Sequence, residues 1–374
     1  MISPSDAFAQ LKARVEYLID HARAAYPLGG VTAYTPVAFG TAYKALYLRD
    51  FTYMAESAPE FIPSDHIQKI LALFVSHITR EGLCPERISD TGEVIYVCHG
   101  PRPAGDCAMF LVKLAAAYAD NGHDPKFIDT IYPALCRTID AVPIDPATGL
   151  VYIDPAAPST AYGFTDTIAI TGQHLFCSLL LYESRRTLER FARLLNQDAT
   201  RHTDHAARIR KNLGALWSPT DNLFLAGSQD CRQPDIWGSA YACAISAIDP
   251  PRRQVIADSL WQKKGRFLFR GQVRHLLTPD HWQKLILDVP ETQPGNFQNG
   301  AYWGTATGWV AETFEPTRPG AGIKLLTDLV QDFHDHGVWE CIGPAGYQRI
   351  ENNVSSACLP YASFKRLTSQ SERP

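Results

Sequence analysis

Clusters of polar and aromatic residues occur at six places in the 374-residue chain, each just ahead of a segment rich in small, apolar and aromatic residues. Carboxylates and amides hydrogen-bond hydroxyl groups in pairs, and tryptophan and tyrosine rings pack against the apolar face of a pyranose. These residue types therefore suit the recognition of a sugar. The clusters are Arg49-Asp50-Phe51, Gly105-Asp106, Gly163-Phe164-Thr165-Asp166, Asp235-Ile236-Trp237, Gln298-Asn299-Gly300 and Glu351-Asn352-Asn353.

Chemistry on a glycosidic bond would require two carboxyl groups, one protonated to assist the leaving oxygen and one ionised to activate water or attack directly. The clusters contain the carboxyl groups of Asp50, Asp106, Asp166, Asp235 and Glu351. Glu340 follows Trp339, and a glutamate among aromatic rings is costly unless its pKa rises or it is paired. Glu351 is a reserve candidate, because it opens an apolar segment where a helix N-terminus would favour its charge.

The sequence motifs that identify several other classes of enzyme are absent. The chain has no GxxxxGK[ST] or GxGxxG phosphate loop, no GxSxG elbow and no HExxH. His334-Asp335-His336 resembles a metal pair, but it ends a helical segment before Gly337, where cations are favoured for electrostatic reasons. The nine cysteines show no CxxC or paired spacing, which argues against a disulfide framework or structural zinc. We expect no cofactor and no metal.

Composition narrows the choice of partners. Lys+Arg 35 against Asp+Glu 39 gives a formal charge of −4, so no basic field is available to attract nucleic acid or anionic lipid. No apolar run approaches the roughly 18 residues of a membrane span, and the first residues lack the pattern of a secretory signal. We expect a cytoplasmic protein that binds a small molecule or an oligosaccharide; the sequence leaves open a secreted form with a trimmed signal, and it leaves the oligomeric state open.

Two kinds of helical segment alternate along the chain. Six have one apolar face, beginning near Ser5, Ser64, Asp124-Pro125, Thr203, Asp249-Pro250 and Pro319. The other six are apolar all round, which is typical of helices buried on every side. They are Phe51–Ala58, Cys107–Tyr118, Thr167–Tyr182, Trp237–Ile248, Gly300–Phe314 and Asn352–Phe364.

This alternation predicts an all-α fold. Asp50, Asp106, Asp166, Trp237, Asn299 and Glu351 are separated by 56, 60, 71, 62 and 52 residues, a weak repeat of one supersecondary unit. The simplest closed arrangement is an (α/α)6 toroid, with an inner ring of six helices, an outer ring of six and all polar clusters at one end. We expect residues 1–374 to form a single domain, with short β-hairpin excursions near 151–153 and 267–269.

Several runs resemble the six-hairpin glycosidases, the (α/α)6-barrel hydrolases that include glucoamylases, trehalases, processing α-glucosidases and neutral invertases. The resemblance covers nearly the whole chain in order, through loose motifs. These are Tyr47-Leu48-Arg49-Asp50-Phe51, Tyr162-Gly163-Phe164-Thr165-Asp166, Phe297-Gln298-Asn299-Gly300-Ala301-Tyr302-Trp303 and Trp339-Glu340-Cys341-Ile342-Gly343-Pro344-Ala345-Gly346, followed by Asn353-Val354-Ser355-Ser356-Ala357.

The resemblance implies roles for the carboxyl groups. By position, Asp166 would be the general acid and Glu340 the general base of an inverting hydrolase. In the glucosidase and trehalase branches the residue matching Asp50 grips a terminal sugar, here braced by Arg49, whereas in the invertase branch a similar run supplies the acid. Trehalases have a Gly-Trp pair before the acid, where this chain has Gly163-Phe164.

Structural roles compete with these assignments. Asp106 and Asp166 could be helix caps, Asp50 with Arg49 could be a buried ion pair, and the aromatic residues could belong to the core, as we expect for Trp309. Arg274-His275 could form a wall of the site suited to an acidic sugar or a glycerate-like aglycone. The candidate substrate-binding residues are Arg49, Phe51, Asp106, Tyr162, Trp237, Gln298, Asn299, Tyr302, Trp303, Trp339 and Glu351.

The leading hypothesis is therefore an exo-acting, inverting glycoside hydrolase for small glycosides or oligosaccharides. A sugar epimerase or polysaccharide lyase on the same fold is the alternative, and it would place His99, His174 or Tyr162 at the centre of the site as a proton-abstracting group. A non-catalytic glycan-binding barrel is the third possibility, since it keeps the aromatic residues without opposed carboxylates.

Overall fold

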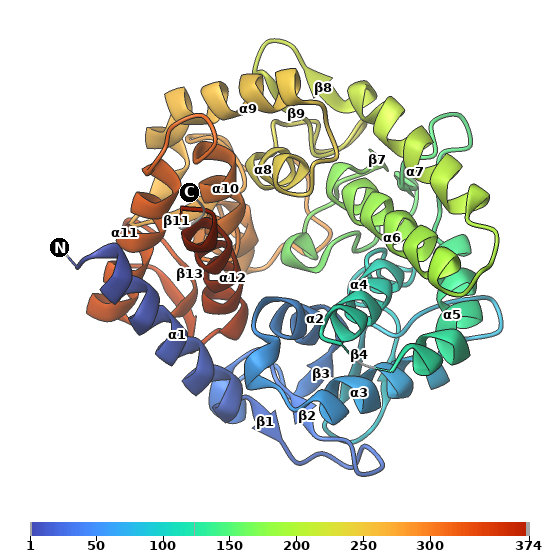
Figure 1. Ribbon diagram of the computed structural model, residues 1–374. Coiled ribbons are helices and arrows are strands. Elements are labelled where there is room, and N and C mark those ends of the chain that lie inside the picture. The colour runs from blue at the N-terminus through green and yellow to red at the C-terminus, as the bar shows by residue number, and fades with distance from the viewer. Residues whose placement is uncertain (1, 123, 372–374) are drawn as a thin grey trace.

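Twelve α-helices alternate between two concentric rings in the computed structural model, which describes residues 2–122 and 124–371 (Figure 1). The all-α toroid expected from the sequence is confirmed. The inner helices are α2 (Leu48–Ser57), α4 (Cys107–Asp120), α6 (Leu175–Leu194), α8 (Ile236–Ala244), α10 (Thr307–Phe314) and α12 (Val354–Ser371). The outer helices are α1 (Pro4–His21), α3 (Ser64–Ser76), α5 (Pro125–Asp140), α7 (Thr200–Asn212), α9 (Pro250–Lys263) and α11 (Ala321–His336).

Contacts between neighbouring inner helices close the ring. Each inner helix packs against the next one in the chain, and α12 returns to pack against α2. Outer helices pack against the inner ring, as α3 does on α4 and α1 on α12. The inner helix α8 is buried from Ile236 to Cys243, whereas the outer helix α7 buries only His202, Ala206 and Ile209. The alternation of apolar character along the sequence thus follows the two rings.

Side-chain caps begin the outer helices α1, α5 and α9. Asp124 accepts a hydrogen bond from the Lys126 N–H at 2.9 Å and Asp249 accepts one from Arg252, each just before a proline in the first turn. At α1 the cap is Ser3, two residues before the expected Ser5.

Two inner helices start later than their apolar segments predict. Residues 167–174 form turns, strand β7 and an extended stretch before α6 begins at Leu175. Residues 300–306 include strand β12 before α10 begins at Thr307. Both segments are buried, and burial on every side occurs in loops and strands of a core as well as in helices. The expected helices Thr167–Tyr182 and Gly300–Phe314 are therefore wrong in their first turns.

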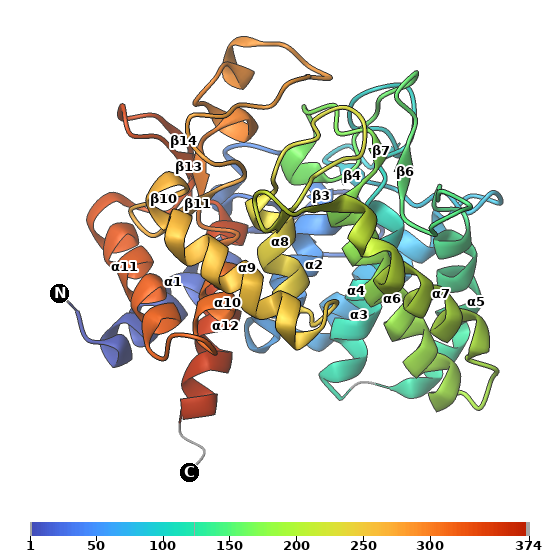
Figure 2. The same ribbon diagram turned by 90° about the horizontal axis from the view of Figure 1, so that it is seen from above.

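Short antiparallel strands gather at one end of the ring (Figure 2). The five-stranded sheet consists of β10 (Leu268–Phe269), β11 (Gln272–Arg274), β12 (Tyr302–Trp303), β13 (Trp339–Ile342) and β14 (Gln348–Glu351). A three-stranded sheet consists of β3 (Ala45–Tyr47), β4 (Arg87–Ser89) and β5 (Val94–Ile95). The pairs are β1 (Arg23–Ala24) with β2 (Ala33–Tyr34), β6 (Tyr152–Ile153) with β7 (Gly172–Gln173), and β8 (Trp217–Ser218) with β9 (Leu223–Phe224). Strands are present at both expected excursions: β10 forms the expected short hairpin with β11, whereas β6 pairs with the more distant β7.

Single turns of 3-10 helix complete the connections. Two of them, η3 and η7, carry residues of the site described below. The turns are η1 (Ala38–Gly40), η2 (Pro59–Phe61), η3 (Gly163–Thr165), η4 (Leu213–Leu216), η5 (Lys264–Arg266), η6 (Pro290–Thr292) and η7 (Phe297–Asn299). None of the helices in residues 2–122 and 124–371 combines the length and apolar character needed to cross a bilayer.

Candidate active site

Three carboxyl groups from distant parts of the chain line one pocket of about 180 Å³. They are those of Asp50, Asp166 and Glu340, the three candidates from the sequence. The fold brings them together because α2, the segment after η3 and strand β13 all reach the end of the ring where the strands gather (Figure 2). The other lining residues are Pro36, Tyr43, Tyr47, Arg49, Arg87, Cys98, His99, Gly163, Phe164, Phe297, Gln298, Trp303 and Asn353.

Asp50 lies in the first turn of α2, where the helix N-terminus favours a negative charge. Its Oδ1 accepts a hydrogen bond from Ser355 Oγ at 3.3 Å, and its Oδ2 lies 3.8 Å from Arg49 Nη2. Burial raises the pKa of Asp50, against the opposing effects of the Arg49 charge and the Ser355 hydrogen bond. Arg49 and Asp50 thus form a buried ion pair, and both residues also line the pocket.

Arg49 connects Asp50 to the carboxylates behind it. Its Nη1 donates to Asp106 Oδ2 at 3.1 Å, and its Nη2 lies 3.5 Å from Glu86 Oε1. Asp106 is fully buried and also accepts the Gly163 N–H at 2.9 Å. Asp106 therefore holds Arg49 and the Gly163 backbone together from behind, and it does not line the pocket.

The guanidinium of Arg49 lies over Gly163, the first residue of η3. A Cβ atom at position 163 would overlap Arg49 Cζ and both terminal nitrogens. Gln298 Nε2 donates to the Gly163 carbonyl at 3.2 Å, and Gln298 Oε1 accepts from Thr167 N and Oγ1 at 2.9 and 2.7 Å. The segment that carries Asp166 is thereby fixed at both ends.

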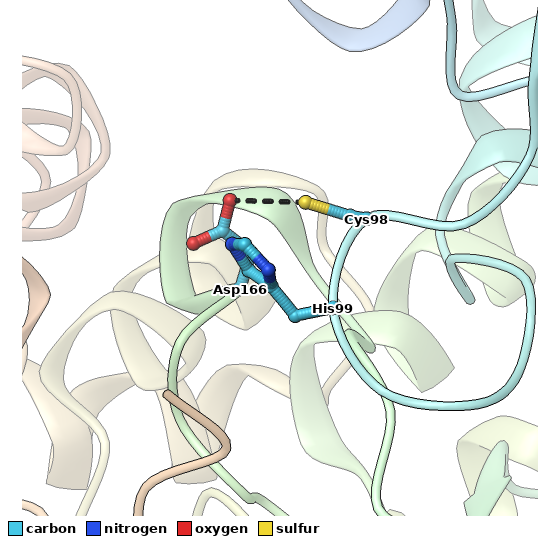
Figure 3. A group of neighbouring side chains, drawn as sticks. All are labelled: Cys98, His99 and Asp166. Atoms are coloured by element: carbon cyan, nitrogen blue, oxygen red, sulfur yellow. Dashed lines mark hydrogen bonds between the residues drawn. The ribbon is translucent and has the colours of Figure 1, made fainter. Parts of the chain in front are cut away.

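Asp166 follows η3 directly and has a sparse set of partners. Its Oδ2 accepts a hydrogen bond from the Cys98 thiol at 3.4 Å (Figure 3). Its Oδ1 is buried and has no hydrogen-bond partner among residues 2–122 and 124–371. Since α6 begins only at Leu175, Asp166 is not the cap of that helix.

Glu340 lies on β13, and two side chains hold its carboxylate. Tyr43 Oη donates to Oε1 at 2.7 Å, and Arg349 of β14 is hydrogen-bonded to Oε2 and also to Tyr43. Burial raises the pKa of Glu340 to about 7, although Arg349 and Tyr43 act in the opposite direction; the negative charge of Asp50 adds to the rise. A carboxylate with this pKa can accept a proton near neutral pH.

Trp303 is the aromatic residue among the substrate-binding candidates that lines the pocket. It lies on β12, not in the first turn of a helix, and its buried Nε1 has no partner in the described part of the chain. Trp237 lies behind it in an edge contact at 6.0 Å, stacks on His275 at 3.7 Å and donates to the Val273 carbonyl.

The remaining binding candidates lie outside the pocket lining. Phe51 packs against Tyr34 in the core, and Tyr162 shares a hydrogen bond of 2.9 Å with Tyr53. Asn299 accepts the Trp282 N–H and donates to the Thr292 carbonyl, so it closes the loop around η7. The others are Tyr302, which packs on Phe269, Trp339, which donates to the His336 carbonyl, and the exposed Glu351.

Arg274 and His275 do not form a wall of the pocket. The buried guanidinium of Arg274 donates to the Gly300 and Asp280 carbonyls at 2.8 and 2.6 Å. The hydrogen-bonding capacity of this arginine therefore serves to hold backbone segments together.

The candidate proton-abstracting groups of the epimerase or lyase reaction do not meet in the pocket. His174 is buried away from the pocket, where its Nδ1 accepts the Cys177 N–H and burial lowers its pKa to about 3. Tyr162 does not line the pocket either, and of the three only His99 does.

Four residues that contact the carboxyl groups were not site candidates from the sequence: Tyr43, Arg349, Cys98 and Ser355. Arg349 stands opposite Cys341 in the β13–β14 pairing, and its guanidinium is hydrogen-bonded to the carboxylate of the adjacent Glu340. A hairpin signal was present in Gly343-Pro344 and Gly346 between the two strands. Tyr43 lies on a loop 297 residues away from Glu340, and no local pattern announces such a contact.

No family model matches the chain, and no curated protein matches it. Solved structures do match it. An uncharacterised conserved protein from Thermus thermophilus is 15% identical, with a TM-score of 0.67, over 95% of this chain and 100% of that chain. The GH63 mannosylglycerate hydrolase from the same organism, in complex with Tris, is 14% identical, with a TM-score of 0.68, over 95% and 100%.

A rhamnosidase from Klebsiella oxytoca with rhamnose bound is 14% identical, with a TM-score of 0.70, over 98% of this chain and 64% of that chain. At such identities the likeness establishes a shared fold over nearly the whole chain. Activity has to be argued from the site itself.

Proposed function

We propose that the protein is an inverting, exo-acting glycoside hydrolase that acts on small glycosides or oligosaccharides. The observation that carries the proposal is the meeting of Asp50, Asp166 and Glu340 in one pocket at the mouth of the inner ring. Hydrolysis of a glycosidic bond needs two carboxyl groups in different protonation states. The three groups have different partners, so their environments can separate these states.

Glu340 is the proposed general base. Arg349 and the Tyr43 hydroxyl stabilise its ionised form, while burial keeps its pKa near 7, so the carboxylate is both available and basic enough to take a proton from water. Because Arg349 and Tyr43 each donate a hydrogen bond to it, the Glu340 carboxylate is held in one orientation before a substrate binds.

Asp166 is the proposed general acid. Its carboxyl group lines the pocket and has only the Cys98 thiol as a hydrogen-bond partner in the described residues, so it can bond a leaving-group oxygen without losing another partner. The Cys98 thiol and the Gly163–Gln298 contacts keep this carboxyl in place. Asp50 and Arg49 would then grip the hydroxyl groups of the terminal sugar. Asp50 is the competitor for the acid role, since burial raises its pKa.

The size of the pocket supports action at a chain end. About 180 Å³ is small beside the roughly 300–1,000 Å³ of sites that enclose drug-sized ligands. It suits a single sugar residue, with the remainder of the substrate at the mouth. The solved neighbours named above include a mannosylglycerate hydrolase and a rhamnosidase, which supports a small glycoside as substrate.

A substrate panel with the anomeric product followed by NMR tests the proposal. We would include mannosylglycerate, α-rhamnosides, α-glucosides and trehalose. The expected result is hydrolysis of at least one member, with the first product in the anomeric form opposite to that of the substrate. Release of the same anomer would overturn the inverting mechanism, and no hydrolysis together with epimerised or unsaturated sugar would favour the epimerase or lyase reaction.

A further inference from the structure

Cys98, His99 and Asp166 form a cluster at the edge of the pocket. Each offers one atom that can bind a metal ion, and these three atoms all lie within 4.8 Å of one another (Figure 3). All three residues line the pocket and are half-buried, so an ion can reach them from solvent. Sulfur, imidazole nitrogen and carboxylate oxygen together are a ligand set typical of zinc, whereas Ca²⁺ and Mg²⁺ prefer oxygen ligands.

The spacing of the sulfur and oxygen atoms is close to that of a tetrahedral site. Cys98 Sγ lies 3.4 Å from Asp166 Oδ2. Zn–S and Zn–O bonds of about 2.3 and 2.1 Å at a tetrahedral angle put these two atoms about 3.6 Å apart. The His99 ring makes no hydrogen bond within residues 2–122 and 124–371, so no existing bond has to be broken to turn it toward an ion.

The backbone holds the two segments of the cluster together without any ion. Thr160 N donates to the His99 carbonyl at 3.0 Å, and the His99 N–H donates to Thr160 Oγ1 at 3.1 Å. The same hydroxyl lies 3.1 Å from the Asp166 carbonyl. Gly100 permits the turn after His99, because it has a φ of +86° and a Cβ atom there would overlap the Pro158 carbonyl. Little ordering entropy is therefore lost when the ligands converge.

We propose that Cys98, His99 and Asp166 form an inhibitory binding site for a thiophilic divalent cation such as Zn²⁺. Three protein ligands leave the fourth position open to water or a substrate hydroxyl in the pocket. Binding displaces the thiol proton of Cys98 into solvent and ties up the carboxylate of Asp166. The inhibitory part rests on the proposed role of Asp166 as general acid; the binding part does not.

Cobalt gives a direct spectroscopic test, because Co²⁺ bound to thiolate in a tetrahedral site shows strong visible bands and a sulfur-to-metal charge-transfer band. The probes are Co²⁺ and Zn²⁺ added to the purified chain, with calorimetry for the affinity. We expect one Co²⁺ to bind with these bands and Zn²⁺ to displace it. Cys98→Ser and His99→Gln should each weaken Zn²⁺ binding about tenfold or more, whereas Cys231→Ser, a buried cysteine outside the pocket, should not.

Absence of the charge-transfer band, or equal Zn²⁺ affinity in Cys98→Ser, overturns the site. The proposed function fails differently. If Co²⁺ binds with the expected bands and Zn²⁺ displaces it, but hydrolysis proceeds unchanged with Zn²⁺ bound, the site stands and the assignment of Asp166 as acid is wrong. If hydrolysis is observed and no metal binds, the function stands without this inference. Inhibition that follows the occupancy measured by calorimetry supports both.

Discussion

The Arg49 guanidinium occupies the space that any side chain at Gly163 would need. Gly163 begins the turn that ends at Asp166. The contact of Arg49 with Asp50 and the position of Asp166 therefore both depend on this glycine. Asp106 fixes the same pair from behind by accepting from Arg49 Nη1 and the Gly163 N–H. Two of the three carboxyl groups are thus positioned by a single buried network.

Gly163→Ala should reduce hydrolysis while the chain still folds. The added methyl group displaces Arg49 and shifts the segment of Asp166, and misplacement of a catalytic group by about 1 Å can cost roughly a hundredfold. We expect kcat/KM to fall about tenfold to a hundredfold in steady-state assays. Gly265→Ala is the control, because a Cβ atom there meets nothing within 4 Å; equal activity of the two variants would contradict this role of Gly163.

The pH dependence of the reaction should report Glu340. Its pKa is raised to about 7, and only the ionised form can act as base, so kcat/KM is expected to increase as the pH rises through about 7. The Tyr43 hydrogen bond lowers this pKa, so Tyr43→Phe should move the acidic limb to higher pH. Tyr47→Phe, on the same pocket, should leave the position of the limb unchanged; a limb that does not move in Tyr43→Phe would argue against Glu340 as base.

Trp303→Phe should weaken the binding of substrate, an effect that can be distinguished from a change in stability. Its indole N–H is buried without a partner in the described residues, so an incoming sugar hydroxyl would satisfy it. Loss of one such hydrogen bond, worth about 1–3 kcal/mol, lowers kcat/KM roughly fivefold to a hundredfold. Kinetics and thermal melts measured together check this. Trp217→Phe on β8 is the control outside the pocket, and a fall in Tm for Trp303→Phe without any change in kcat/KM would contradict the prediction.

Asp235, at the start of α8, should make stability depend on pH. Burial raises its pKa to about 7, against the opposing effect of the Gly238 and Trp237 N–H groups, from about 3.9 in the unfolded chain. The stability that this group contributes is complete below about pH 4 and is lost as the pH rises through about 7. Asp235→Asn keeps a favourable N-cap and removes this loss, so its Tm should exceed that of the wild type by several degrees at pH 8 but not at pH 4. An equal difference in Tm between Asp235→Asn and the wild type at both pH values would contradict this role of Asp235.

The sequence predicted the two rings because their helices differ in chemistry. Outer helices have one wet face, and some have a readable start, as Asp124-Pro125 shows, while inner helices such as α8 are apolar all round. Apolar character on every side also led to wrong helix predictions at 167–174 and 300–306, where the buried chain forms loops and strands. Residues such as Ile168 belong to a second small core under the long connections. Apart from the strands at the two expected excursions, strands of two to four residues carry too few alternations to be recognised.

The site was predictable to the extent that its residues occur in motifs. Asp50, Asp166 and Glu340 stand in recognisable runs, and the structure places all three on one pocket. Asp106 stands in an equivalent run but is fully buried, where it accepts a hydrogen bond from Arg49 and does not line the pocket. Tyr43 and Cys98 depend on contacts between distant loops, which only the folded chain reveals.

The roles of acid and base are tested most sharply by comparing Asp166→Asn and Glu340→Gln on a natural glycoside and on a dinitrophenyl glycoside of the same sugar. A dinitrophenolate leaves without protonation, so loss of the acid matters only for the natural substrate, whereas loss of the base affects both. We predict that Asp166→Asn loses about a hundredfold or more on the natural glycoside only, and that Glu340→Gln loses as much on both. If Asp50→Asn shows the selective pattern instead, or if Glu340→Gln retains activity on either substrate, the assignment of acid and base is wrong.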